Sequence, residues 1–134
     1  MAIKNSSIKN EPHLIQDFNI KMVREFTHNN DEFIVSTLHL LSEALIDEQK
    51  NLSTALINND LEILKFITHR IKSNFHLLGL KNLGELCDEV AKKDTSLDEV
   101  KELCASIVKS IPYLLGKIEL QGGKKTKERK MLLI

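Results

Sequence analysis

The chain is poor in the residues that usually mark turns, with five glycines and two prolines among 134 residues, and it has no tryptophan and one tyrosine. So few turn-forming residues argue against a fold built from many short strands. The sequence has no apolar run of about 18 residues and no apolar signal-peptide core at its N-terminus. We therefore expect a cytoplasmic protein with no stable membrane insertion.

A net charge is also lacking, because 19 Lys and Arg residues balance 19 Asp and Glu residues. Nucleic-acid-binding domains normally carry a basic surface, so we expect no nucleic-acid partner. The two cysteines, Cys87 and Cys104, fall on apolar helix positions with no Cys or His at metal-ligand spacing, which indicates reduced core thiols. We expect a monomer with no bound cofactor and no metal site.

Leucine and isoleucine instead dominate the apolar residues, which make up 42% of the chain. They recur at steps of three and four residues, the spacing of one helix face. This spacing predicts helices over residues 12–27, 31–57, 60–78, 80–93 and from 97 onward. The length suits one hydrophobic core, which we place at residues 12–120, between a flexible N-terminus (1–11) and a basic C-terminal tail (121–134).

Polar residues before three of these helices predict their first turns. Capping boxes are expected at Asn29 with Glu32, at Asn59 with Glu62 and at Ser96 with Glu99. In a capping box, the side chain of each of two residues three positions apart accepts a hydrogen bond from the backbone amide of the other. Gly79 should end the helix over 60–78, because glycine accepts left-handed backbone. Pro112 should kink or interrupt the last helix, because proline lacks an amide proton.

Short connections make consecutive helices antiparallel neighbours. We therefore predict an all-α fold, an antiparallel up-and-down four-helix bundle of the second to fifth helices, with an additional N-terminal helix packed across it.

The helix over 60–78 divides into two faces. Its apolar stripe comprises Leu64, Ile67, Ile71, Phe75 and Leu78. At about 100° per residue, His69 lies on the opposite face. The polar residues that share this face are Lys65, Lys72, Ser73 and His76. The helix thus presents a histidine to solvent with a lysine one turn away.

This arrangement resembles the histidine-containing phosphotransfer (HPt) domain of multistep two-component relays. The positions that match the family's marked residues are His69, Ile71, Lys72, Leu78 and Gly79. The apolar positions that resemble the family's next helix are Leu80, Leu83, Cys87 and Val90. Ser73 stands where the family usually has glycine, and Phe75 and His76 replace residues that are often small. The resemblance extends from about Phe33 to Ile118.

The chemistry of such a face fits phosphoryl transfer. Free histidine has a pKa of about 6.5, so an exposed imidazole is largely neutral and nucleophilic at cytosolic pH. Lys72, three residues on, would stand about 5–6 Å away and stabilise a dianion. Lys65 could assist it, and Ser73 leaves space for the group and could donate a hydrogen bond.

The resemblance implies a phosphorelay protein and phosphoprotein with phosphohistidine at His69, formed on Nε2. It implies response-regulator receiver domains and a hybrid histidine kinase as partners, with Mg²⁺ on the receiver. The chain would carry the phosphoryl group without being an enzyme, since no ATP-binding motif is present. We expect Lys65, Phe66, His76 and Lys81 to contact the partner.

Several of these residues allow a second interpretation. Phe66 could instead contact the first helix, and His76 could be a second acceptor. The chain as a whole could be a degenerate HPt-like bundle, or an unrelated helical adaptor, that binds a signalling partner without accepting phosphate. The basic tail is either a solvated segment or an element that docks on a partner or a membrane surface.

Overall fold

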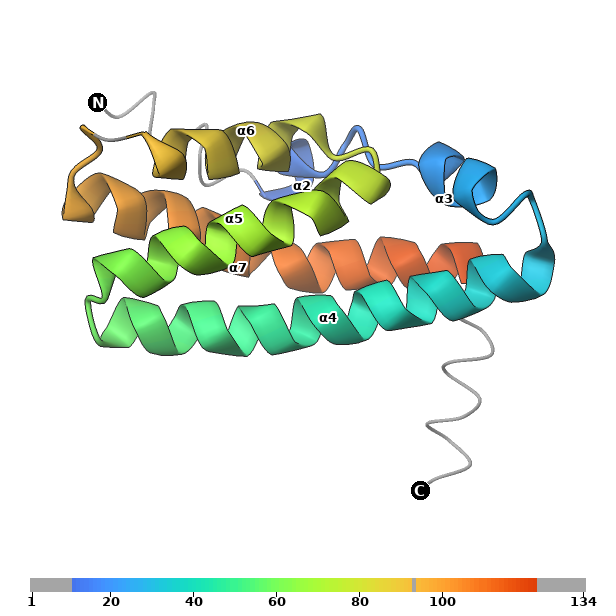
Figure 1. Cartoon of the computed structure of the whole chain (residues 1–134), viewed down its shortest axis with the longest axis horizontal. Helices are drawn as coiled ribbons and strands as arrows, with labels where there is room; N and C mark the ends of the chain where they lie inside the picture. Colours follow the sequence, from blue (N-terminus) through green and yellow to red (C-terminus); the bar gives the residue numbers. More distant parts are fainter. Residues whose placement is uncertain (1–10, 93, 123–134) are drawn as a thin grey trace, which may run out of the picture.

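The regular spacing of leucine and isoleucine is realised as helices. The computed structural model describes residues 11–92 and 94–122, and no strand occurs within these ranges. The helices are α2 (Glu11–Leu14), α3 (Lys21–Phe26), α4 (Asp31–Ile57), α5 (Leu61–Leu77), α6 (Lys81–Ala91) and α7 (Leu97–Gly122) (Figure 1). The prediction of an all-helical fold is confirmed.

The four longer helices, α4 to α7, lie lengthwise beside one another in Figure 1 and form a helical bundle. Contacts join α4 with α5 and α7, and α6 with α5 and α7. The inward faces of these helices share one apolar core, to which α2 and α3 add Leu14 and Val23. The fully buried large side chains include Phe75, Leu45 and Ile107. Burial of the apolar face of each helix, rather than intrinsic helix propensity, supplies most of the stability of such helices.

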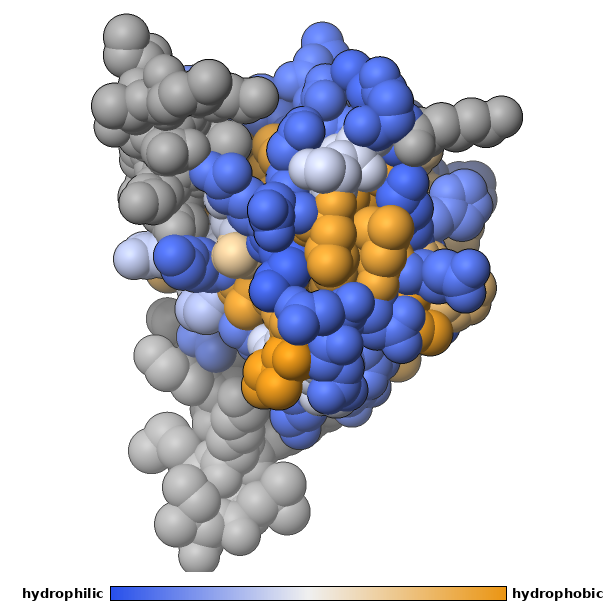
Figure 2. All heavy atoms as spheres, turned by 90° about the vertical axis from the view of Figure 1, so that its left-hand side faces the viewer, coloured by the Kyte–Doolittle hydropathy of each residue, from blue (hydrophilic) through white to orange (hydrophobic). Residues whose placement is uncertain are grey.

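The bundle end at which α4 passes into α5 is mainly hydrophilic, with a small group of apolar side chains in its middle (Figure 2). At this end Ile57 is exposed, and Leu61 and Leu97 are half-buried. No described helix is both long enough and apolar enough to cross a lipid bilayer.

The bounds of α4 agree with the prediction, but two capping residues were placed one position too early. Asn30, not Asn29, caps α4 and accepts a hydrogen bond from the Phe33 amide at 3.0 Å. Asp60, not Asn59, caps α5 in the same way. Asn29 and Asn59 have φ values of 58° and 53°, which lie in the left-handed region. An N-cap residue usually has extended backbone instead, so the next residue in each case is the N-cap. The Ser96 cap is confirmed, since its hydroxyl accepts from the Glu99 amide.

The N-terminal helix predicted over 12–27 is wrong, because α2 and α3 are separated by a non-helical segment. Within this segment the Asn19 amide donates to the Leu78 carbonyl at 2.9 Å. The Asp17 carboxylate accepts from the Asn82 amide, in the first turn of α6, at 3.2 Å. Asp17 thus caps a helix whose own N-cap, Leu80, has no side-chain acceptor. These long-range bonds hold the segment against the start of α6 and override its helical pattern.

Gly79 ends α5 as predicted. Its φ is +71°, and two backbone bonds close the helix end. The Gly79 amide donates to the His76 carbonyl at 3.1 Å, and the Leu80 amide donates to the Phe75 carbonyl at 2.9 Å. This pair of bonds is the Schellman motif, which requires the left-handed residue that glycine supplies. The next helix therefore begins at Lys81 and ends at Ala91, shorter than the predicted 80–93.

Pro112 does not interrupt the last helix, contrary to the prediction, since α7 continues through it to Gly122. Proline removes the amide that would bond the carbonyl four residues earlier, which is that of Val108. The Gln49 side-chain amide donates to this carbonyl at 3.3 Å from α4. A side chain of a neighbouring helix thus satisfies the acceptor that Pro112 leaves without its helical partner.

This contact predicts a dependence between Gln49 and Pro112. Gln49→Ala should lower the free energy of unfolding by about 1 kcal/mol, the usual contribution of one intramolecular hydrogen bond. In a Pro112→Ala background, where residue 112 can bond Val108 itself, the same change should cost much less. Urea unfolding of the four proteins measures the coupling, and equal costs in both backgrounds would contradict this role of Gln49.

The predicted termini mostly lie outside the described residues, so nothing is shown of 1–10 or of 123–134. Of the residues assigned to these termini, the structure describes Glu11, the first residue of α2, and Gln121 and Gly122, the last two of α7. The two cysteines are free and buried as predicted. Burial raises the pKa of each thiol to about 12, so neither is a reactive thiolate.

Candidate functional site

The side of α5 that faces away from the core carries the predicted acceptor. His69 is exposed, while Leu64, Ile71 and Phe75 on the opposite side are completely buried. An open hollow surrounds the imidazole. The residues that line the hollow are Phe66, His69, Arg70, Lys72, Ser73 and His76. The structure thus brings His69, Lys72, Ser73, Phe66 and His76 together on one face, as their spacing predicted.

Lys72 lies one turn after His69, but its ammonium group is bound to the next helix. Lys72 Nζ is 2.5 Å from Asp88 Oδ1 on α6. Both side chains are about half exposed, and this hydrogen bond, followed by the coulombic attraction of Asp88, raises the pKa of Lys72. The lysine is therefore cationic and directed toward α6.

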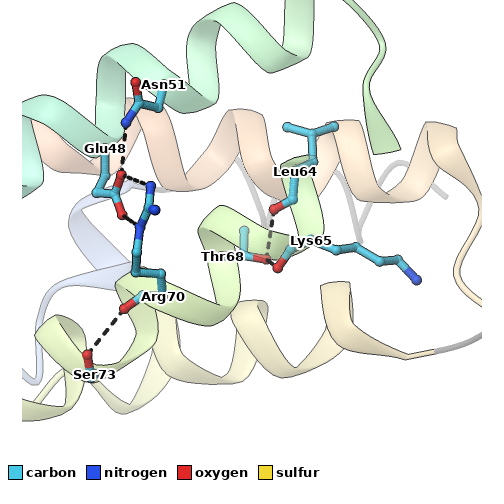
Figure 3. Close-up of polar contacts among 7 residues, drawn as sticks. All are labelled: Glu48, Asn51, Leu64, Lys65, Thr68, Arg70 and Ser73. Carbon is cyan, nitrogen blue, oxygen red and sulfur yellow. Dashed lines mark hydrogen bonds and ion pairs between the residues drawn. The ribbon is translucent and has the colours of Figure 1, made fainter. Parts of the chain in front are cut away.

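Ser73 and Lys65 have partners of their own. The exposed Ser73 hydroxyl donates to the Arg70 carbonyl of its own helix at 3.2 Å (Figure 3). Lys65 Nζ donates to the Lys92 carbonyl, just beyond the end of α6, at 3.1 Å. In Figure 3 the Lys65 side chain extends away from Arg70 and Ser73. The serine thus stands beside the histidine, whereas the structure does not bring Lys65 into the hollow.

An anchored arginine next to the histidine was not anticipated from the sequence. Arg70 Nε and Nη2 donate to the two carboxylate oxygens of Glu48 on α4, at 2.5 and 2.7 Å (Figure 3). Glu48 is 6% exposed and also accepts from Asn51. The Arg70 guanidinium lies over the Phe66 ring, 4.9 Å from its centroid. Phe66, which is 57% exposed, is thus held beside His69 by a cation–π contact.

The Glu48 pair predicts a pH dependence of stability. Burial raises the pKa of Glu48, but the hydrogen bonds from Arg70 and Asn51 outweigh it and leave this pKa below 4.5, the ordinary value. A lowered folded-state pKa contributes stability that is present above 4.5 and is lost as the pH falls through the folded value. Glu48→Gln should therefore unfold with a weaker dependence on pH below 4.5, measured by urea unfolding across pH 2–6. An unchanged acid slope would contradict the assignment.

A second hollow adjoins the first and reaches the N-terminal segment. It is lined by Lys72, His76, Lys81, Gly84, Glu85 and Asp88, together with Asn19, Lys21, Met22, Gly79 and Leu80. Lys72 and His76 line both hollows. Lys81, predicted to contact a partner, therefore belongs to this second hollow and not to the wall around His69.

The described residues contain no group of three or more His, Cys, Asp or Glu side chains that could hold a metal ion. Comparison with known proteins adds no relative, since no family model, curated protein or solved structure matches the chain. The chemistry open to the site therefore follows from its own geometry. It offers an exposed imidazole, a nearby lysine and an anchored arginine, a set suited to accepting an anionic group.

Proposed function

We propose that this protein is a histidine phosphotransfer protein, which relays a phosphoryl group between aspartates of receiver domains in a two-component phosphorelay. The observation that carries the proposal is the exposed His69 on the flank of a helical bundle, with Lys72 one turn further along α5. We also infer the finer fold of this class, an antiparallel up-and-down four-helix bundle of α4 to α7. Three short connections and the reversals of chain direction visible in Figure 1 support it.

The proposed step is an in-line transfer of one phosphoryl group. The Nε2 lone pair of neutral His69 forms a P–N bond while the P–O bond to the receiver's aspartate breaks, and the carboxylate leaves with the bonding electron pair. The reverse reaction delivers the group to a second receiver's aspartate. The receiver would supply Mg²⁺, and this chain would supply the nucleophile and the cation of Lys72. The protein would act as a carrier and have no kinase activity of its own.

Side chains around His69 would form the surface that meets a receiver. Phe66 offers an exposed ring beside the histidine, and the Glu48–Arg70 pair holds it in place. A rigid, exposed aromatic side chain is typical of residues that dominate protein–protein binding. His76 and Lys81, one on each side of Gly79, extend the surface toward α6. We propose that the protein performs this relay as a cytoplasmic monomer, between a hybrid histidine kinase and a response regulator.

The test is transfer from receiver domains carrying a ³²P-labelled aspartyl phosphate to the purified protein. We expect label that is acid-labile and base-stable, located on His69 by peptide mapping. A chain ending at residue 122 should accept it equally well, because the proposal uses no residue of the tail. Binding of a receiver without any transfer would replace the relay with the degenerate, phosphate-free adaptor. Loss of receiver binding on removal of 123–134 would point to an adaptor that works through its tail.

A further inference from the structure

Lys72 belongs to both hollows of the candidate site. It lines the first hollow together with His69 and the second hollow together with Asp88. In the structure its ammonium group is on the Asp88 side, with Nζ 2.5 Å from Oδ1. The side chains of this pair are 47% and 58% exposed, so the lysine can turn toward His69 without being buried or losing contact with water.

Asp88 is held on α6 by its buried neighbours. Cys87 and Val90 are 2% and 0% exposed and fix this face of the helix against the core. The carboxylate therefore has a defined place beside α5, sixteen residues further along the chain than its partner. A second carboxylate, Glu85, and two further cationic side chains, Lys21 and Lys81, line the same hollow. Among the described residues, Lys72 forms its ion pair with Asp88.

We propose that Asp88 is a positioning residue for the phosphoryl transfer, acting through Lys72; this inference rests on the proposed function. In the unphosphorylated protein Asp88 holds the ammonium group on α6. After His69 accepts the phosphoryl group, the new charge of about −1.5 to −2 draws Lys72 away from the carboxylate. The broken ion pair offsets part of the gain from the new one, so the group on His69 remains easy to pass to the next receiver.

The size of this effect follows from the exposure of the pair. An ion pair between exposed side chains is weak, and breaking one changes an equilibrium by no more than about fivefold. Asp88→Asn should therefore shift the equilibrium distribution of label between the receiver's aspartate and His69 toward His69 by about two- to fivefold. A salt concentration of 1 M should reduce the shift, because the screening length then falls to about 3 Å.

The measurement is the equilibrium ratio of labelled protein to labelled receiver after mixing. The matched control is Glu89→Gln, which removes one charge from the adjacent position and breaks an exposed pair with Lys92, 2.9 Å long. This control should leave the ratio unchanged. Asp88→Glu should restore the wild-type ratio, since it can again bind the ammonium group. Folding is checked by thermal unfolding, which these surface changes should hardly affect.

The decisive variant combines both partners. Lys72→Ala alone should shift the label toward the receiver, and adding Asp88→Asn to it should produce no further change, because the carboxylate acts through the lysine. A full two- to fivefold gain in the Lys72→Ala background, or an equal gain from Glu89→Gln, would overturn the inference and leave the relay intact. If the folded wild-type protein takes label from no receiver, the proposed function itself fails, and this inference fails with it.

Discussion

His69→Gln is expected to abolish acid-labile phosphorylation of the protein, whereas His76→Gln is expected to preserve it. Glutamine is neutral, polar and similar in length to histidine, but it has no nucleophilic ring nitrogen. His69 is exposed and lies on the face opposite the buried Phe75 and Ile71, so the substitution should leave the bundle folded. The loss of label should therefore be complete and should arise from the missing nucleophile alone.

His76 provides a closely matched control. It is also an exposed histidine, lies two turns further along α5 and lines the same hollow. Transfer from a labelled receiver, followed over time with both variants, separates the two histidines. Label that survives His69→Gln and disappears in His76→Gln would move the acceptor to His76. Lys72→Ala, which retains the nucleophile, should slow the transfer without abolishing it.

The sequence predicted the face of α5 well and its partners poorly. A period of 3.6 residues determines which side chains of one helix share a side, so His69, Lys72 and Ser73 could be placed together without coordinates. The bond of Lys72 to Asp88 links different helices, and that of Arg70 to Glu48 spans 22 residues. Such pairs depend on how one helix is rotated and shifted against another, which the periodicity of a single helix does not contain.

The same distinction explains the errors in the fold. Local patterns predicted a continuous helix over 12–27 and a break at Pro112, and both predictions were wrong. In each case a contact from a distant part of the chain changes the local outcome. Asn82 and Leu78 bond the segment between α2 and α3, and Gln49 supplies the donor that Pro112 lacks. The end of α5 at Gly79 was predictable, because it depends on a left-handed backbone at that one residue, which is a local property.

Gly79→Ala is expected to destabilise the protein by about 2–3 kcal/mol. Gly79 has a φ of +71°, and a Cβ atom there would lie 2.2 Å from the Asn19 side-chain nitrogen. Left-handed backbone costs a residue with a Cβ about 1–2 kcal/mol. Asn19 would also have to move, although its side chain bonds the Asp17 carbonyl and the Lys21 amide. Weakening these bonds adds about 0.5–1.5 kcal/mol for each bond lost.

Two further variants assign this loss to the contact with Asn19. Gly116→Ala places the same methyl group in a helix where no atom beyond its chain neighbours and the adjoining helix backbone lies within 4 Å. It should therefore stabilise the protein by about 0.5–1 kcal/mol. Asn19→Ala removes the obstructing amide, so its cost and that of Gly79→Ala should sum to more than the cost of the double variant. Urea unfolding of all four variants measures these differences. Strict additivity would mean that the backbone strain acts alone and that the N-terminal segment does not depend on this glycine for its place beside the second hollow.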